Sequence, residues 1–285
     1  MTDYEVIVVD DGSTDNTAIV LHPLIEQGRI RYVYHSNQGI SAARNLGYSL
    51  AKGKYIAFLD DDDLFIEHKL QQQAAFLEEN PEIECVGGAR QCFGCHEALI
   101  SAPEPCVSLR HLFRGNVVGT VGQTLIRKNA LDELTDGAEG RTGLYDVSLR
   151  ACEDWDVWFR LASRHNLHCN DQVVLMYRTH DNSISQDLAL MLDTVITVID
   201  RQMLLVNSQD RPECRKAAAQ CIFWNFVRPL LIRSLSSCKS GKFSQSLKDI
   251  HALRRWVTSV AGQPNIYLEA GKFAAKRVLR LNERQ

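Results

Sequence analysis

The sequence predicts an α/β protein, in which a mostly parallel open sheet with helices on both faces is followed by a helical C-terminal extension. Short apolar segments alternate with helix-forming segments from residue 6 onward, and such alternation is typical of parallel sheets. Two of the apolar segments end abruptly in runs of aspartate. From about residue 188 the pattern is helical, with few strand signals. We therefore expect two domains, residues 1–187 and residues 188–285.

The first strand is expected at residues 6–9, where four β-branched residues follow one another. A continuous run of this kind indicates a strand buried on both faces. The next helix should be capped by Ser13 or Thr14, because hydroxyl side chains accept hydrogen bonds from the first amides of a helix. A second strand is expected at residues 30–34. Ligands of such sheets bind at the carboxyl ends of the strands, where Asp10 and Asp11 lie.

A second helix should begin with Ser41 as its cap and end near Gly53, and a third strand then leads into four aspartates at positions 60–63. Gathering these carboxylates is costly, because each raises the pKa of its neighbours. A divalent cation with a phosphate-bearing ligand would relieve the repulsion. In an extended segment, Asp60 and Asp62 would face the same side. The alternative is a solvated acidic turn that ends the strand.

Further strands are expected at residues 83–87, 121–126 and 173–176, and residues 152–160 are expected to begin a helix. That helix has an apolar stripe behind Glu153 and Asp154. Acidic residues in a first turn also complement the helix dipole without any further role. The loops at 94–107 and 132–145 would lie over the second substrate, since loops at such places often decide specificity.

Four segments occur in a characteristic order: EVIVVDDGSTDNT, NQGISAARNLGYSLAKGKYIAFLDDDDLF, CEDWDVWFRLA and YRTHDNSIS. Together they resemble the family 2 glycosyltransferases, which are inverting enzymes with the A-type nucleotide-sugar fold. The resemblance covers residues 3–185. It implies that residues 1–187 bind a nucleotide-diphosphate sugar and that the acceptor is a saccharide or a lipid-linked saccharide, as in cell-surface polysaccharide or glycolipid synthesis.

The resemblance also implies roles for the aspartates of the strand ends. Asp10 or Asp11 would contact the nucleotide base, with Asp11 preferred, and Arg44 would lie against the nucleotide and its diphosphate. The Asp-x-Asp pair of the family corresponds to Asp60 and Asp62. The residue between them is usually small or neutral in the family. Here it is Asp61, which we expect to contribute to nucleotide binding.

The same resemblance implies a metal and a base. Asp62, with Asp60, would hold Mg²⁺ or Mn²⁺, since these cations take hard oxygen ligands. His180 of the fourth segment is a further candidate metal ligand, although a lone histidine is more often structural. Asp154 corresponds to the general base of the family, with Glu153 as the alternative. An acceptor hydroxyl needs such a base, because it is a poor nucleophile until its proton is removed.

One departure concerns the start of the chain. The family normally begins with a strand, a turn similar to P-x-Y-N and a helix before the VVDDGS strand. We expect this chain to lack that unit of about 30 to 40 residues, which would leave the strand at 6–9 at a sheet edge. Two other functions are therefore considered: an inactive remnant that binds nucleotide or protein, and a nucleotidyltransferase.

Composition narrows the partners. The formal net charge of −3 argues against nucleic acid as a ligand. Nine cysteines without a secretory pattern indicate reduced thiols, and we expect a cytoplasmic protein. The basic amphipathic segment at 268–280 could contact an anionic membrane, which would place the protein at the inner face of the plasma membrane. A solvated terminal helix is the alternative.

Overall fold

The computed structural model describes residues 3–102, 105–135, 143–181, 183–240 and 242–262. The chain forms two compact units. The first unit contains residues up to 107 together with 118–179, and the helical unit contains 108–117 together with the described residues from 180 onward. Compared with the expected domains, this division places residues 180–187 and 108–117 with the helices.

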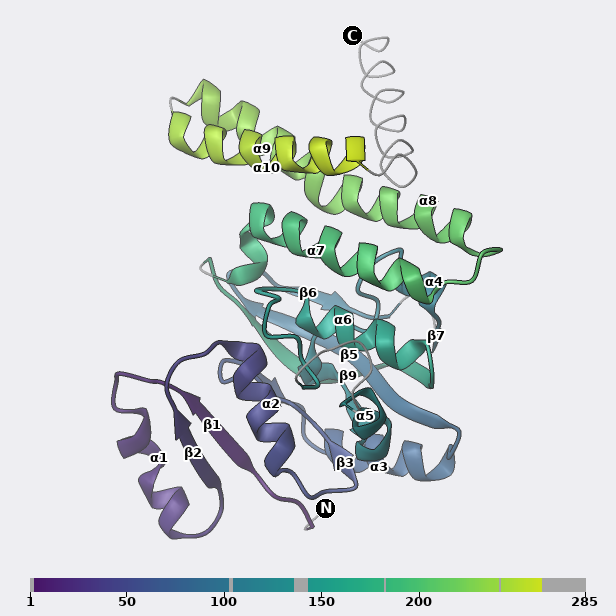
Figure 1. Cartoon of the computed structure of the whole chain (residues 1–285). Coiled ribbons are helices and arrows are strands. Elements are labelled where there is room, and N and C mark those ends of the chain that lie inside the picture. Colours follow the sequence, from purple (N-terminus) through teal and green to yellow (C-terminus); the bar gives the residue numbers. More distant parts are fainter. Residues whose placement is uncertain (1–2, 103–104, 136–142, 182, 241, 263–285) are drawn as a thin grey trace. The chain divides into compact units, whose positions relative to one another are not determined.

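The first unit opens with two β–α repeats. Strands β1 (Ile7–Asp11) and β2 (Arg31–His35) pair in parallel as a two-stranded sheet. Helix α1 (Thr17–Glu26) follows β1, and helix α2 (Ile40–Leu50) follows β2. Figure 1 shows α2 against this small sheet. Among the described residues, β1 pairs with no strand other than β2.

The expected helix caps are wrong in both cases. Asn16 occupies the N-cap of α1. The carboxylate of the preceding Asp15, rather than Ser13 or Thr14, accepts hydrogen bonds from the backbone N–H and the hydroxyl of Thr17 at the start of the helix. Gly39 occupies the N-cap of α2. Its φ of 90° favours glycine, so the chain enters the helix one residue before Ser41, which is buried inside it.

The large sheet of the first unit is mixed rather than mostly parallel. Its central strands follow the order β3-β8-β5-β9-β4, and only β5 and β9 run parallel. The α/β class is confirmed, but the expected strand direction is wrong here, since apolar runs show burial and do not show direction. The strands of this sheet are β3 (Tyr55–Ile56), β4 (Leu64–Phe65), β5 (Ile83–Gly94), β6 (Ala98–Ile100), β7 (Cys106–Val107), β8 (Leu125–Arg127) and β9 (Asn166–Thr179).

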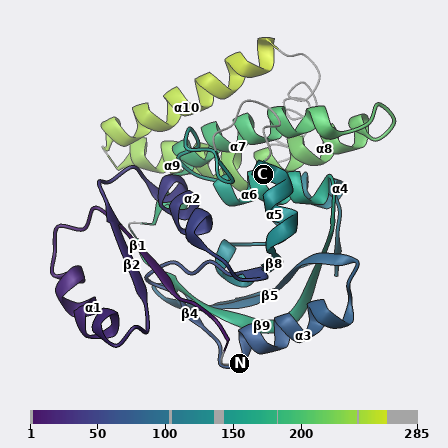
Figure 2. The same cartoon turned by 60° about the horizontal axis from the view of Figure 1, so that its bottom comes forward.

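Helices cover both faces of the large sheet. Figure 2 shows α3 (Lys69–Glu79) on one face, with α5 (Lys128–Thr135) and α6 (Glu153–Ala162) on the other. A short 3₁₀ helix at Val121–Gln123 precedes β8, where the sequence had suggested only a strand. Under α3, a buried cluster joins helix and sheet, formed by Ala74, Leu77, Val86 and Leu125.

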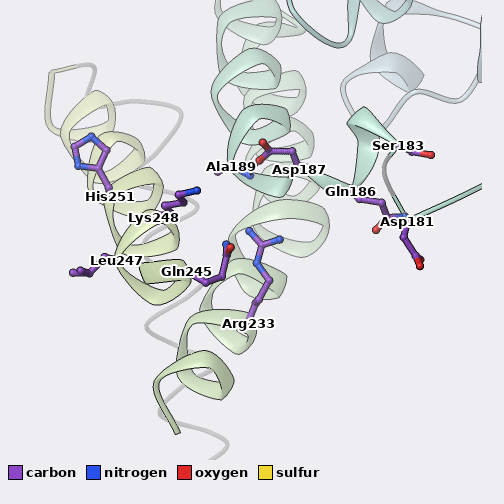
Figure 3. A pocket seen from close by; sticks show the side chains of 10 residues that line it. All are labelled: Asp181, Ser183, Gln186, Asp187, Ala189, Arg233, Gln245, Leu247, Lys248 and His251. Carbon is purple, nitrogen blue, oxygen red and sulfur yellow. Dashed lines mark hydrogen bonds between the residues drawn. The ribbon is translucent and has the colours of Figure 1, made fainter. Parts of the chain in front are cut away.

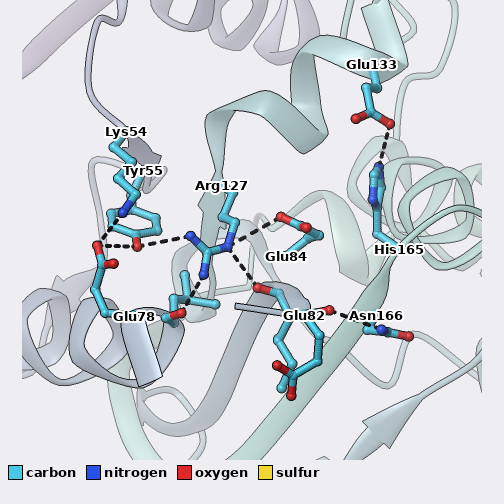
Figure 4. A network of polar contacts seen from close by, with 11 residues as sticks. Lys54, Tyr55, Glu78, Glu82, Glu84, Arg127, Glu133, His165 and Asn166 are labelled. Carbon is cyan, nitrogen blue, oxygen red and sulfur yellow. Dashed lines mark hydrogen bonds and ion pairs between the residues drawn. The ribbon is translucent and has the colours of Figure 1, made fainter. Parts of the chain in front are cut away.

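Arg127 joins the elements around the beginning of β3 (Figure 4). Its Nε donates to the carbonyl of Ile83 at 3.0 Å, and its NH2 group donates to the carbonyl of Leu77. Its NH1 group donates to the Tyr55 hydroxyl at 3.3 Å. The side chain is only 12% exposed. Because Tyr55 starts the segment that leads to the four aspartates, Arg127 anchors that segment to α3 and β5.

Replacing Arg127 with Ala should lower the free energy of unfolding by about 2–4 kcal/mol, since it leaves buried carbonyls without their donor. Urea unfolding followed by circular dichroism measures the change. Lys54→Met is the control, because the neighbouring Lys54–Glu78 pair is exposed, and exposed ion pairs add little to stability. Equal losses in the two variants would contradict the anchoring role of Arg127.

The helical unit confirms the helical pattern expected from residue 188. Its helices are α4 (Leu109–Leu112), α7 (Leu188–Gln202), α8 (Arg211–Ile222), α9 (Arg228–Lys239) and α10 (Phe243–Gly262), with short 3₁₀ turns at Ile184–Gln186 and Met203–Leu205 and a π-helical turn at Phe223–Val227. None of the described helices combines the length and the apolar character needed to cross a bilayer. The eight cysteines whose side chains are described are all free thiols.

Candidate functional site

The four aspartates form a turn and not an extended segment. Strand β3 ends at Ile56, and the backbone N–H of Asp63 donates to the carbonyl of Asp60 at 3.2 Å. The expectation that Asp60 and Asp62 share one side of an extended strand is therefore wrong. In this turn the last three aspartates differ in burial: Asp61 is exposed, Asp62 is half-buried and Asp63 is 4% exposed.

Strand β9 holds this acidic turn from the other side. The backbone N–H of Arg178 donates to the Asp63 carboxylate at 2.8 Å, and the Arg178 Nε donates to the carbonyl of Asp62 at 3.0 Å. Burial raises the pKa of Asp63 to about 6, with the Arg178 N–H opposing the shift and the carboxylates of Asp62 and Asp60 adding to it. The turn is thus fixed to the sheet through the backbone as well as through side chains.

Arg44 is the centre of the polar cluster in the first unit. From α2, one of its terminal nitrogens donates to Asp60 at 2.6 Å and the other donates to Glu153 at 2.6 Å. The Arg44 side chain is 10% exposed, and that of Glu153 is 11% exposed. One guanidinium therefore connects α2, the acidic turn and the first turn of α6, which come from two of the four characteristic segments.

The surroundings of Arg44 favour its charged form. Burial by itself lowers the pKa of Arg44, but the neighbouring carboxylates of Asp60 and Glu153 help to outweigh it, and the pKa is raised overall. The guanidinium also lies 5.6 Å from the centre of the Tyr145 ring, within cation–π range. Burial raises the pKa of the Tyr145 hydroxyl, so this tyrosine stays neutral beside the carboxylates.

The first turn of α6 presents Glu153 and Asp154 differently. Cys152 precedes the helix in the left-handed region, with φ of 56°, and such strain in a non-glycine residue is often found at functional sites. Glu153 is buried and paired with Arg44. Asp154 is half-buried, and one of its carboxylate oxygens accepts from the Trp155 N–H at 2.6 Å. Of the two acids, Asp154 is the more accessible to a substrate.

Residues 143–145 end the loop that was expected over the second substrate, but no contact with the helices of the site was assigned to them from sequence. Asn45 and Tyr145 exchange two hydrogen bonds, one from the Asn45 amide to the Tyr145 carbonyl at 2.8 Å and one from the Tyr145 N–H at 2.7 Å. From α6, Arg160 donates to the carbonyl of Leu144 and pairs with the fully buried Asp156. The sequence offered one indication of the contact between Asn45 and Tyr145, namely that Asn45 directly follows Arg44.

Asp10 and Asp11 lie at the end of β1 and organise the loops there. Asp10 accepts from the Tyr32 hydroxyl at 2.5 Å and from the Ser13 N–H at 2.7 Å, and these bonds lower its pKa. Asp11 accepts from the N–H groups of Gln38 and Gly39 at 2.8 and 2.9 Å. The nucleotide-base role assigned to the two aspartates stays a prediction.

The acidic turn fits the donor chemistry of Mg²⁺ or Mn²⁺, since the carboxylates of Asp60 and Asp62 are hard oxygen donors and Asp63 Oδ2 is buried without a hydrogen-bond partner among the described residues. No group of three or more His, Cys, Asp and Glu side chains that could hold a metal occurs in the described part of the chain. His180 begins the helical unit, and its role as a metal ligand stays a prediction.

A separate cavity of about 700 Å³ lies entirely within the helical unit. Figure 3 shows polar side chains of both charges around it. One lining residue is Arg233, which donates two hydrogen bonds to the fully buried Asp249. The lining consists of Asp181, Ser183, Gln186, Asp187, Ala189, Arg233, Gln245, Leu247, Lys248 and His251.

Known proteins resemble part of this chain. Residues 1–134 match the model of glycosyl transferase family 2. An uncharacterized glycosyltransferase of Rickettsia felis is 34% identical over 168 residues, which is 58% of this chain and 26% of that protein. One of Haemophilus influenzae is 27% identical over 164 residues, which is 56% of this chain and 52% of that protein. The matched part spans about a quarter of the Rickettsia relative and about half of the Haemophilus relative.

Solved structures share the fold. S. aureus TarS 1–349 in complex with UDP aligns with a TM-score of 0.52 at 17% identity, over 92% of this chain and 83% of that one. The mannosyltransferase PcManGT of Pyrobaculum calidifontis, in complex with GDP-Man and Mn²⁺, aligns with a TM-score of 0.53 at 15% identity, over 99% and 79% of the two chains.

The fold is thus shared with these solved structures. Over residues 1–134 the chain is similar to glycosyl transferase family 2, and the curated relatives that it matches are named as glycosyltransferases.

Proposed function

We propose that the protein transfers a sugar from a nucleotide-diphosphate donor to an acceptor hydroxyl, with inversion at the anomeric carbon. One observation carries the proposal: Arg44 of α2 contacts Asp60 of the acidic turn and Glu153 of the first turn of α6, each at 2.6 Å. A donor diphosphate near the acidic turn and an acceptor near Asp154 would then be adjacent. The structural neighbours bound to UDP and GDP-Man support a nucleotide donor.

In the proposed reaction Asp154 takes the proton of the acceptor hydroxyl as its oxygen attacks the anomeric carbon. The bond between this carbon and the diphosphate oxygen breaks, and the nucleoside diphosphate leaves with the electron pair. A single displacement inverts the configuration. Asp154 suits this role because its side chain is half-buried and therefore partly accessible to a substrate. The carboxylate of Glu153, in contrast, accepts a hydrogen bond from Arg44.

Mg²⁺ or Mn²⁺ would be held by Asp62 and Asp60, and when bound it neutralises charge on the leaving diphosphate. Around that position, Arg178 and Asp63 fix the turn so that the carboxylate of Asp62 keeps its place relative to the sheet. Asp60 stays oriented by Arg44. The Mn²⁺ present in the PcManGT structure supports the proposal of a metal.

Binding of UDP or GDP should depend on the metal. Calorimetry with and without Mn²⁺ is expected to show tighter nucleotide binding with the metal, and Asp62→Ala should remove most of that difference, because a carboxylate ligand is lost. Asp171→Ala is the matched control, since Asp171 is an exposed aspartate of β9. Equal affinity with and without Mn²⁺, or an unchanged metal effect in Asp62→Ala, would contradict the metal site.

Product analysis with nucleotide-sugar donors separates the alternatives. Release of nucleoside diphosphate with a new glycosidic bond supports the proposal. Release of pyrophosphate would instead indicate a nucleotidyltransferase. Nucleotide binding without turnover would favour a binding remnant. Saccharide and lipid-linked saccharide acceptors, and a location on the cytoplasmic side of the plasma membrane, complete the proposal and are tested by acceptor screening and by cell fractionation.

A further inference from the structure

Helices α9 and α10 bury small and polar side chains where they pack. Besides Leu230, the buried described residues of the two helices are Ser234, Ser237, Ser246, Asp249 and Ala252. The hydroxyls of Ser234 and Ser246 lie 3.1 Å apart, and Asp249 is fully buried against Arg233. Small residues let two helices approach closely, and among the described side chains of α9 and α10 the buried apolar ones are only Leu230 and Ala252.

The large apolar side chains of the same helices point away from this interface. In α9, Leu231, Ile232 and Leu235 are 41%, 52% and 65% exposed. In α10, Leu247 and Ile250 are 66% and 51% exposed. Surface helices of water-soluble proteins normally show the opposite arrangement, with the apolar stripe inside.

The exposed apolar residues share helix faces with basic ones. Arg228 precedes Leu231, Ile232 and Leu235 at the spacing i, i+3, i+4, i+7, so the four lie on one face of α9. The same spacing places Leu247, Ile250, His251 and Arg254 on one face of α10. Each stripe therefore combines apolar and basic side chains, and neither contains an acidic residue.

Helices α9 and α10 form a helical hairpin, residues 228–262, whose net charge differs in sign from that of the whole chain. Residues 228–262 contain seven Lys and Arg residues and one acidic residue, within a chain whose net charge is −3. The one acid, Asp249, is fully buried and neutralises Arg233. The charges that the hairpin presents to its surroundings are therefore positive.

We infer that the exposed stripes of α9 and α10 form a docking surface for an anionic lipid membrane. Apolar side chains interleaved with Lys and Arg are typical of helices that lie in the headgroup region, where anionic lipids attract the cations. A second copy of the chain is a poorer occupant, because two hairpins with this positive charge repel each other. The segment at 268–280, which the sequence suggested for membrane contact, lies outside the described residues.

Vesicle flotation with the full chain tests this inference. Binding should be at least about tenfold stronger to phosphatidylcholine vesicles that contain phosphatidylglycerol than to phosphatidylcholine alone, and high salt should weaken it. Two variants remove the apolar side chains of one stripe each: Leu231→Ser/Ile232→Ser/Leu235→Ser in α9 and Leu247→Ser/Ile250→Ser in α10. Each variant should lower vesicle binding about tenfold or more, because it removes apolar area that the bound membrane would cover. Arg228→Glu/Arg254→Glu, which reverses an exposed basic side chain on each stripe, should abolish the preference for the anionic lipid.

Matched controls come from the first unit. Ile19→Ser/Val20→Ser removes apolar side chains of 75% and 64% exposure, and Arg29→Glu/Arg31→Glu reverses two exposed charges; neither should change vesicle binding. Equal binding of wild type and hairpin variants would overturn the inference and point to another segment. Wild-type dimers that the hairpin variants abolish would favour a second copy. Oligonucleotide binding that survives loss of the apolar side chains would favour a polyanion.

Discussion

The variant Asp154→Asn should turn over about 100-fold more slowly than the wild type, or slower still. Asparagine nearly keeps the shape of the side chain but cannot accept the acceptor proton, and a general base typically contributes about 10²–10⁴-fold. Donor affinity should barely change, because the base faces the acceptor. Steady-state kinetics with a nucleotide-sugar donor, together with calorimetry for UDP or GDP, measures both quantities.

Glu153→Gln is the comparison that decides between the two acids. Its carboxylate is committed to Arg44 at 2.6 Å, so this change should lower stability and keep a base of unchanged chemistry. If Asp154→Asn turned over like the wild type while Glu153→Gln lost turnover in a folded state, the base would be Glu153.

Replacing Arg44 with Met should have the largest combined effect. It leaves Asp60 and Glu153 as uncompensated carboxylates in a site where their side chains are 29% and 11% exposed. Removing one partner of a buried ion pair costs about 3–5 kcal/mol, so the urea midpoint should fall markedly. Nucleotide affinity should fall as well, because the acidic turn loses the group that orients Asp60.

The triple variant Arg44→Met/Asp60→Asn/Glu153→Gln separates the two effects. It removes the unpaired charges, so much of the lost stability should return, as neutral replacements of buried ion pairs often cost little. Nucleotide binding should stay low. Arg44→Lys should not restore the wild type, since a single ammonium cannot span two carboxylates as the planar guanidinium does. An unchanged urea midpoint in Arg44→Met would contradict the central role of Arg44.

Local patterns predicted where the elements lie better than how they connect. The strands near residues 6–9 and 30–34 and the helix that begins near residue 152 were expected from apolar runs and periodicity, and they occur within a few residues of those positions. Strand direction was not predicted correctly, because β8 reaches the sheet from the opposite sense to β5. That choice depends on tertiary packing, which no local run of residues encodes.

The site was predicted residue by residue and not as a geometry. Arg44, Asp60 and Glu153 were all named from sequence, and the structure brings them into direct contact. Their mutual pairing was not foreseen, since it joins positions up to 109 residues apart. Tyr145 was included only as the end of the loop at 132–145, without a role of its own. It lies in an irregular segment, where neither periodicity nor capping marks a residue that tertiary contacts will bury.

The placement of residues 108–117 has a consequence for how the chain is made. This segment lies between strands of the first unit in sequence but belongs to the helical unit, where Arg110 of α4 pairs with Glu213 of α8. Its Leu112 and Phe113 are fully buried. During synthesis these side chains emerge about a hundred residues before α8, and contacts so distant in sequence form slowly. The helical unit is therefore completed only after α8 has been made, and a fragment ending at residue 179 would keep the apolar segment 108–117 without α8, which contacts α4.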